Sequence, residues 1–73
     1  MPLFVFKAIE IEKKLKKLGF ECVRQKGSHK QFRHTIDNRA TTVPFHKGKD
    51  VSPILFKKIA SDIKISAEEL ANQ

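Results

Sequence analysis

The spacing of the apolar residues changes twice along this chain, from a helical period to a strand-like alternation and back. The first segment repeats every three or four residues, as on one face of a helix; its members are Phe4, Ala8, Ile11, Leu15 and Leu18. Gly19 follows and is expected to end this helix in the left-handed conformation. A second stripe of the same kind comprises Leu55, Phe56, Ile59, Ala60 and Ile63. Two amphipathic helices therefore flank a middle segment of a different kind.

The middle segment is expected to form an antiparallel meander. Phe, Val, Thr and Ile become common there, as strands require, and the pattern predicts strands at residues 20–26, 29–36 and 40–45. Gly27-Ser28 suits a two-residue hairpin turn, because glycine tolerates a positive φ. Asp37-Asn38 suits the second turn. Pro44 cannot donate a ladder hydrogen bond, so the third strand is expected at the edge of the sheet.

The ends of the later helices carry cap signals. Ser52 precedes Pro53, a pairing typical of a helix start. Ser66 and Glu69 have the spacing of a capping box and predict a short C-terminal helix. The order helix, three strands, helix, short helix is that of an α+β domain with its helices on one face of the sheet. This is the α-β-β-β-α outline of a double-stranded-RNA-binding fold, expected as one domain over residues 1–73.

Composition narrows the partners and the compartment. Fifteen Lys and Arg against eight Asp and Glu give a formal net charge of +7, which favours nucleic acid or an acidic protein as the partner. A chain of 73 residues leaves no room for a cofactor cavity. The single cysteine, Cys22, excludes an intramolecular disulfide and suits a cytoplasmic location. No export signal or membrane span is evident in the sequence.

Strand alternation singles out one histidine. It separates Phe32, His34 and Ile36 from His29, Gln31 and Arg33. If Phe32 and Ile36 enter the core, His29 faces solvent beside the glycine turn. The basic and hydroxyl residues around it that are candidates for phosphate binding are Arg24, Lys26, Ser28, Lys30, Arg33 and Lys47. Two further side chains, Phe45 and Cys22, are expected to pack inside the protein.

The residue types restrict what His29 can do. A metal site needs several converging ligands, and His34 is expected on the opposite face, so metal catalysis is disfavoured. A triad with Ser28 lacks a placed acid. RNA offers simpler chemistry, because its own 2′-hydroxyl attacks the phosphorus once one imidazole removes the proton and cations stabilise the charge. From spacing alone, a surface histidine without a catalytic role is the more frequent case.

Several motifs occur together in a characteristic order: Leu18-Gly19-Phe20, then Val23-Arg24-Gln25-Lys26-Gly27-Ser28-His29 with Phe32, then Thr42-Val43-Pro44-Phe45-His46. With these spacings, residues 8–70 resemble HicA, the toxin of HicAB toxin–antitoxin modules. The resemblance implies a metal-independent ribonuclease that cuts mRNA, with the histidine of the Gly-Ser-His turn as the catalytic residue. That histidine is His29 here. It also implies a cognate HicB antitoxin, acidic enough to cover the basic face.

Some assignments stay open at this point. His46 is one candidate for protonating the leaving 5′-oxygen. A non-catalytic RNA-binding module of the same fold would recognise backbone shape without cutting. A small interaction protein, whose basicity serves only an acidic partner, would lack RNA affinity even at low salt, whereas both RNA functions predict an affinity that falls as salt rises.

Overall fold

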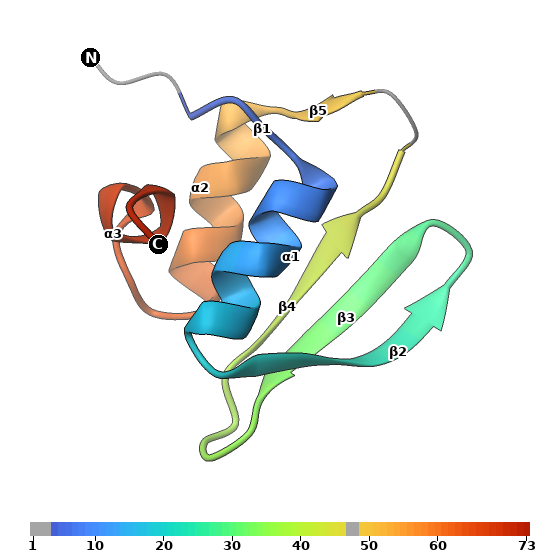
Figure 1. Cartoon of the computed structure of the whole chain (residues 1–73), viewed down its shortest axis with the longest axis vertical. Helices are drawn as coiled ribbons and strands as arrows, with labels where there is room; N and C mark the ends of the chain where they lie inside the picture. Colours follow the sequence, from blue (N-terminus) through green and yellow to red (C-terminus); the bar gives the residue numbers. More distant parts are fainter. Residues whose placement is uncertain (1–3, 47–48) are drawn as a thin grey trace.

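A computed structural model describes residues 4–46 and 49–73, and it confirms the expected α+β class (Figure 1). The elements in chain order are β1 (Phe6–Lys7), α1 (Ala8–Lys17), β2 (Phe20–Lys26), β3 (His29–His34), β4 (Ala40–Pro44), β5 (Asp50–Val51), α2 (Pro53–Asp62) and α3 (Ala67–Ala71). Strands β2, β3 and β4 form the antiparallel sheet, in that order. Helices α1 and α2 cover one face of it, and α3 packs beside them (Figure 1). Lys47 lies outside the described residues.

The sheet is built as the turn chemistry indicates. Gly27 adopts a φ of 59°, and Lys26 pairs with His29 across the two-residue turn. The strand β4 pairs only with β3 among the described strands, so it is an edge strand, as Pro44 predicts. The register between β2 and β3 shifts between Cys22 and Arg24. This β-bulge leaves one extra residue on β2 and changes which of its side chains point to each face.

The core lies between the two long helices and the sheet. Its largest fully buried side chains come from every layer: Phe20, Phe32 and Val43 from the sheet, Ile11 and Leu15 from α1, Phe56, Ile59 and Ile63 from α2 and the residue after it, and Leu70 from α3. Phe45 is partly buried and packs against this cluster. Full burial of each large apolar side chain contributes roughly 1.5–3 kcal/mol. Both predicted apolar stripes therefore face the core.

The helix ends agree with their sequence signals. The Oγ of Ser52 accepts a hydrogen bond from the Leu55 amide at 3.2 Å, and the Oγ of Ser66 accepts one from the Glu69 amide at 3.0 Å. Gly19, which follows the C-cap residue Leu18 of α1, has a φ of 96°, as predicted. A Cβ at this glycine would stand 2.9 Å from Nε2 of His34, so the position needs glycine for space as well as for conformation.

A small two-stranded sheet joins the segment before α1 to the segment before α2, and the sequence pattern does not predict it. Phe6 of β1 pairs with Val51 of β5. The preceding residue Phe4 is buried and stacks on Phe56 of α2, with ring centroids 5.5 Å apart. Phe4 therefore belongs to the core but does not extend the first helix, because the backbone is already extended where β1 pairs.

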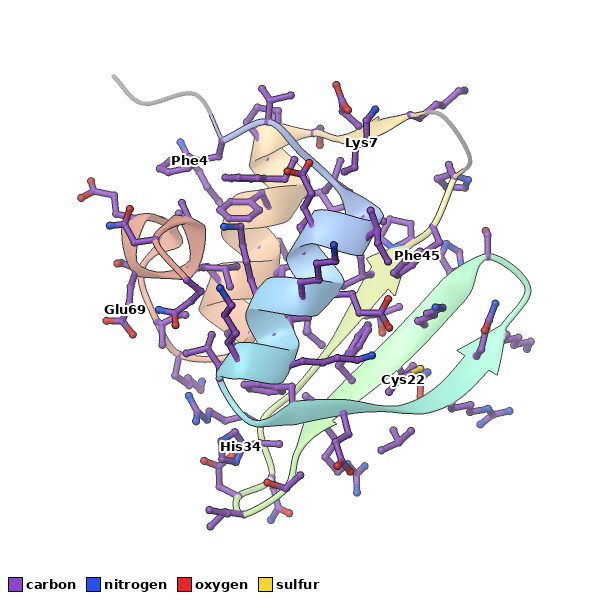
Figure 2. All side chains as sticks on the ribbon, viewed as in Figure 1. Phe4, Lys7, Cys22, His34, Phe45 and Glu69 are labelled. Atoms are coloured by element: carbon purple, nitrogen blue, oxygen red, sulfur yellow. The ribbon has the colours of Figure 1, made fainter. Side chains whose placement is uncertain are left out.

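Two burial predictions are wrong. Strand β3 ends at His34, and Ile36, which alternation places with Phe32, is 89% exposed because it lies in the turn beyond the sheet. Cys22 is exposed rather than buried. Although it pairs with Phe32, the β2–β3 hairpin extends beyond the two helices, so the middle of β2 has no helix above it (Figures 1 and 2).

Candidate functional site

Two histidines meet at the open end of the sheet. His29 is the first residue of β3 and is exposed, as predicted. Its backbone partner in β4 is Pro44, and the amide of Phe45 donates a hydrogen bond to the Ser28 carbonyl. The chain after β4 therefore continues alongside the hairpin turn and brings His46 next to His29. The ring centroids lie 6.1 Å apart, and the ring planes are nearly perpendicular at 83°.

Cationic side chains share the face of the sheet on which His29 lies. Directly paired residues of neighbouring strands point to the same face. Lys26 pairs with His29, and Arg24 pairs with Gln31, which alternates with His29. Arg33 follows on the same face of β3, two residues further along. By the same rule Glu21, which pairs with Arg33, also lies on this face. We call this surface, formed by Glu21, Arg24, Lys26, His29, Gln31 and Arg33, the open face; it carries three cations and one carboxylate.

The bulge in β2 is what gathers these residues. By simple alternation, Arg24 would follow Phe20 and Cys22 onto the helix-covered face. The extra residue at Val23 reverses the alternation, so that Arg24 pairs with Gln31 instead. Arg24 thereby joins His29 on the open face. The sequence carries no signal for this bulge, since no glycine marks it.

The structure does not bring Lys30 into this group. Because Lys30 lies between His29 and Gln31 in β3, its side chain is on the opposite face of the strand. There its Nζ lies 3.6 Å from a carboxylate oxygen of Glu12 and 4.3 Å from the centroid of the Phe45 ring. Lys30 is therefore turned toward α1 and away from the open face.

Ser28 and Gly27 shape the turn through their backbones. The Ser28 carbonyl holds the Phe45 amide, and the Gly27 carbonyl accepts a hydrogen bond from Nε2 of Gln25 at 3.2 Å. A Cβ at Gly27 would meet nothing within 4 Å, so this glycine serves backbone conformation and leaves the turn open to solvent. His29 is exposed beside this turn, so the described residues leave it accessible to a ligand.

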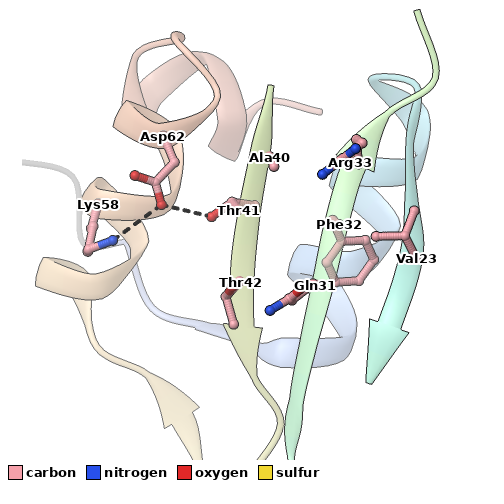
Figure 3. Close-up of a pocket in the computed structure, with 9 residues that line it drawn as sticks. All are labelled: Val23, Gln31, Phe32, Arg33, Ala40, Thr41, Thr42, Lys58 and Asp62. Carbon is pink, nitrogen blue, oxygen red and sulfur yellow. Dashed lines mark hydrogen bonds and ion pairs between the residues drawn. The ribbon is translucent and has the colours of Figure 1, made fainter. Parts of the chain in front are cut away.

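A shallow depression continues the open face away from the histidines (Figure 3). It is lined by Val23, Gln31, Phe32, Arg33, Ala40, Thr41, Thr42, Lys58 and Asp62. At its wall, Asp62 accepts a hydrogen bond from Thr41 Oγ1 at 3.0 Å and pairs with Lys58 Nζ at 3.3 Å. From His29 to Arg33 along β3 is roughly 13 Å, at about 3.3 Å per residue. An extended polyanion can therefore contact both the histidines and this depression.

The depression includes residues that the sequence does not point to. Lys58 comes from α2, and only the three-dimensional packing of α2 against β4 places it at the wall of this depression. The one visible signal is its spacing of four residues from Asp62, which indicates a helix ion pair but not a position beside the sheet.

Within residues 4–46 and 49–73, no group of three or more His, Cys, Asp or Glu side chains is placed to hold a metal ion. Over the same residues, none of the helices has the length and apolar character needed to cross a membrane.

Comparison with protein families identifies the chain. Residues 9–65 match the family described as the HicA toxin of bacterial toxin–antitoxin systems. The matched segment contains the whole three-stranded sheet, both histidines of the open end and helix α2. A comparison with curated proteins gave no match. Because the family match covers most of the chain and agrees with the observed order of elements, this protein belongs to the HicA toxin family, whose members are known as RNases.

Proposed function

We propose that this HicA toxin is a metal-independent endoribonuclease that cleaves mRNA, with His29 as the catalytic base. The observation that supports it most is the exposed pair of imidazoles, His29 and His46, at the edge of a cationic sheet face. An imidazole exchanges protons near neutral pH, so two of them at one phosphate supply both a base and an acid.

The proposed reaction uses the RNA's own nucleophile. His29 removes the proton from the 2′-hydroxyl, and the resulting oxygen attacks the adjacent phosphorus. The bond from phosphorus to the 5′-oxygen breaks, and His46 donates a proton to that oxygen as it leaves. The products are a 2′,3′-cyclic phosphate and a 5′-hydroxyl, so the strand is cut without a bound metal or a covalent enzyme intermediate.

Three cations of the open face are available for phosphate. Arg24, Lys26 and Arg33 make no ion pair with any described residue, whereas Lys30 and Lys58 are each paired with a carboxylate. Unpaired guanidinium and ammonium groups can bind phosphate oxygens and stabilise the negative charge that builds up on the phosphorus centre. We assign the binding of the RNA phosphates to these three residues and propose that the turn at Ser28 lies beside the phosphate that is cleaved. Lys47 stays a candidate helper on sequence grounds.

The antitoxin is proposed to act on the same face. A toxin of a toxin–antitoxin pair has an antitoxin partner, and the formal charge of +7 favours an acidic one. A HicB-type antitoxin that covers the open face would exclude RNA from His29 and His46 together.

Replacing His29 tests the proposal. His29→Ala is expected to lower the cleavage rate by about 10²- to 10⁴-fold, the usual contribution of a general base, and to abolish growth arrest. The side chain is exposed, so circular dichroism and RNA affinity are expected to match the unaltered protein. An equally toxic, equally active variant would rule out this mechanism. If the unaltered protein binds RNA and yields no cleavage products, the protein is an RNA-binding module instead.

The pH dependence of cleavage tests the role of His46. A base that must be neutral and an acid that must be protonated give a bell-shaped profile of rate against pH. His46→Gln removes the acid, so we expect the rate to fall and the decline on the alkaline side to disappear, while the rise on the acidic side remains. An unchanged alkaline decline would exclude His46 as the proton donor.

A further inference from the structure

Glu12 is a charged residue buried in the interior of the helix layer. Its side chain is 8% exposed, although it lies on α1 among apolar core positions. Its carboxylate oxygen lies 3.6 Å from two ammonium groups, those of Lys16 and Lys30. A buried carboxylate requires such partners, because an isolated charge away from water is strongly disfavoured. The Lys16 side chain is 60% exposed, whereas that of Lys30 is only 23% exposed.

The Lys30 ammonium also contacts an aromatic ring. It lies 4.3 Å above the centroid of Phe45, within the range of a cation–π interaction. Glu12, Lys30 and Phe45 thus form a continuous stack from α1, through β3, to the segment that follows β4. Glu12 fixes the ammonium, and the ammonium fixes the ring.

This stack lies directly behind the two histidines. Lys30 follows His29 in β3, and Phe45 precedes His46. Pro44, the last residue of β4, has no amide hydrogen, and among the described residues the backbone bond that ties the following segment to the hairpin is the one from the Phe45 amide to the Ser28 carbonyl. The packing of the Phe45 side chain therefore controls how closely His46 approaches His29.

We propose that Lys30 is a positioning residue, which holds the His29–His46 pair in its reactive geometry by bridging Glu12 and Phe45. This inference rests on the proposed function and gives Lys30 a role other than binding phosphate. Displacing a catalytic group by about 1 Å costs on the order of 10²-fold in rate, so loosening the stack is expected to reduce turnover without weakening RNA binding.

The test compares two lysines that share one carboxylate. Lys30→Met keeps the length and apolar stem of the side chain but loses the charge over Phe45. Lys16→Met removes the other partner of Glu12 and leaves Phe45 untouched. We expect Lys30→Met to lower kcat for RNA cleavage by about 10²-fold with KM unchanged. Lys16→Met is expected to stay within about twofold of the unaltered kcat, as an exposed ion pair contributes little.

Two further variants check the role of the ring and of the fold. Phe45→Leu removes the aromatic face and is expected to lower kcat like Lys30→Met. Lys30→Arg retains a cation that stacks on an aromatic ring, so it is expected to restore most of the rate. If Lys30→Met raises KM and weakens the salt dependence of binding while kcat is unchanged, Lys30 binds phosphate and the positioning role is wrong.

A readout without RNA separates this inference from the proposed reaction. In the unaltered protein, nuclear Overhauser contacts between the imidazole rings of His29 and His46 are expected, and Lys30→Met is expected to weaken them while Lys16→Met does not. Rings that stay in contact in Lys30→Met would overturn the positioning role whether or not His29 proves catalytic. If His29→Ala cleaves RNA normally, the proposed function fails, while the ring contacts still report on Lys30.

Discussion

Strand β3 carries a histidine at each end, and the two have opposite surroundings. His34 is 11% exposed at its side chain and packs edge-on against Phe20. Its Nε2 lies 3.1 Å from the Leu18 carbonyl, and its Nδ1 accepts hydrogen bonds from the amides of Ile36 and Asp37. His29 is exposed, and its ring has no hydrogen bond to the residues that the structure describes; its aromatic neighbour is His46.

The contrast shows that the two histidines of one strand have different roles: His34 supports the fold, whereas His29 is available to a ligand. Both ring nitrogens of His34 are occupied by backbone contacts, one at the end of α1 and the other at the β3–β4 turn. The His29 ring makes no such contacts, and both of its nitrogens can face a ligand. The difference follows from position: the helices cover the end of the sheet at His34, whereas the hairpin at His29 extends past them (Figure 1).

Removing each imidazole gives the largest stability contrast. His34→Ala removes a side chain that is only 11% exposed and takes the partner from the part-buried Leu18 carbonyl, so we expect a loss of about 1–3 kcal/mol in the free energy of unfolding. Thermal melting would register this as a drop of roughly 4–8 °C per kcal/mol. His29→Ala is expected to stay within about 0.5 kcal/mol, as an exposed position does. Equal losses from the two variants would contradict the contrast.

Replacing the glycines at the two ends of β2 tests the same contrast between the helix-covered end of the sheet and the open end. Gly19→Ala is expected to cost more than about 1 kcal/mol, because the φ of 96° is strained for alanine and the new Cβ meets His34. Gly27→Ala meets no neighbour at a φ of 59°, so its cost is expected to be smaller, about 1 kcal/mol from backbone strain alone. Urea denaturation of both variants measures the order. A larger loss at Gly27 would show that the turn end is the more constrained.

The cations of the open face are tested by salt dependence. In a His29→Ala background, where RNA stays intact, Lys26→Ala is expected to reduce the slope of log affinity against log salt by about 0.7 for single-stranded RNA. Arg24→Ala is expected to act alike. Lys13→Ala, on the exposed side of α1, removes the same charge away from the open face. A slope that falls as much with Lys13→Ala would place the RNA on the helix side instead.

The smallest effect concerns the turn beyond His34. Hydrogen bonds from the Arg39 amide and then from its side chain hold the pKa of Asp37 below its usual value of 3.8. A carboxyl whose pKa is lowered on folding stabilises the protein above that usual value, and the contribution disappears as the pH falls below it. Asp37 is exposed, so Asp37→Asn is expected to lower stability slightly at pH 7 and to have less effect near pH 3. Urea melts at both pH values measure this difference, and an equal effect at both would exclude the ionic role of Asp37.

Most of the fold follows from patterns that span several residues. The helical stripes, the Gly27 turn and the Ser52 cap each rest on local rules that packing did not override. Strands β1 and β5 are two residues long, too short for any alternation to show. The β3–β4 turn forms without glycine because Asp37 accepts the Arg39 amide at 2.9 Å, a local bond that the turn residues Asp37-Asn38 already suggest.

The exposure of His29 on β3 could be predicted from the sequence, but the side chains that surround it could not. Alternation correctly leaves His29 in solvent, and the same rule applied to Lys30 places it on the other face, apart from Arg33. The bulge at Val23 has no sequence marker, so the face of Arg24 could not be derived. The approach of His46 to His29 depends on strand register, which joins residues 17 positions apart in sequence (46 minus 29).

The role of His29 is tested most directly by the chemistry of the cut. RNA is incubated with the purified toxin in EDTA, alongside the same RNA carrying a 2′-deoxynucleotide at the mapped cleavage position, and alongside His29→Ala. We expect fragments ending in a 2′,3′-cyclic phosphate from the first reaction only. Cleavage of the deoxy-substituted RNA at the same position, full activity of His29→Ala, or loss of cleavage in EDTA would contradict the account.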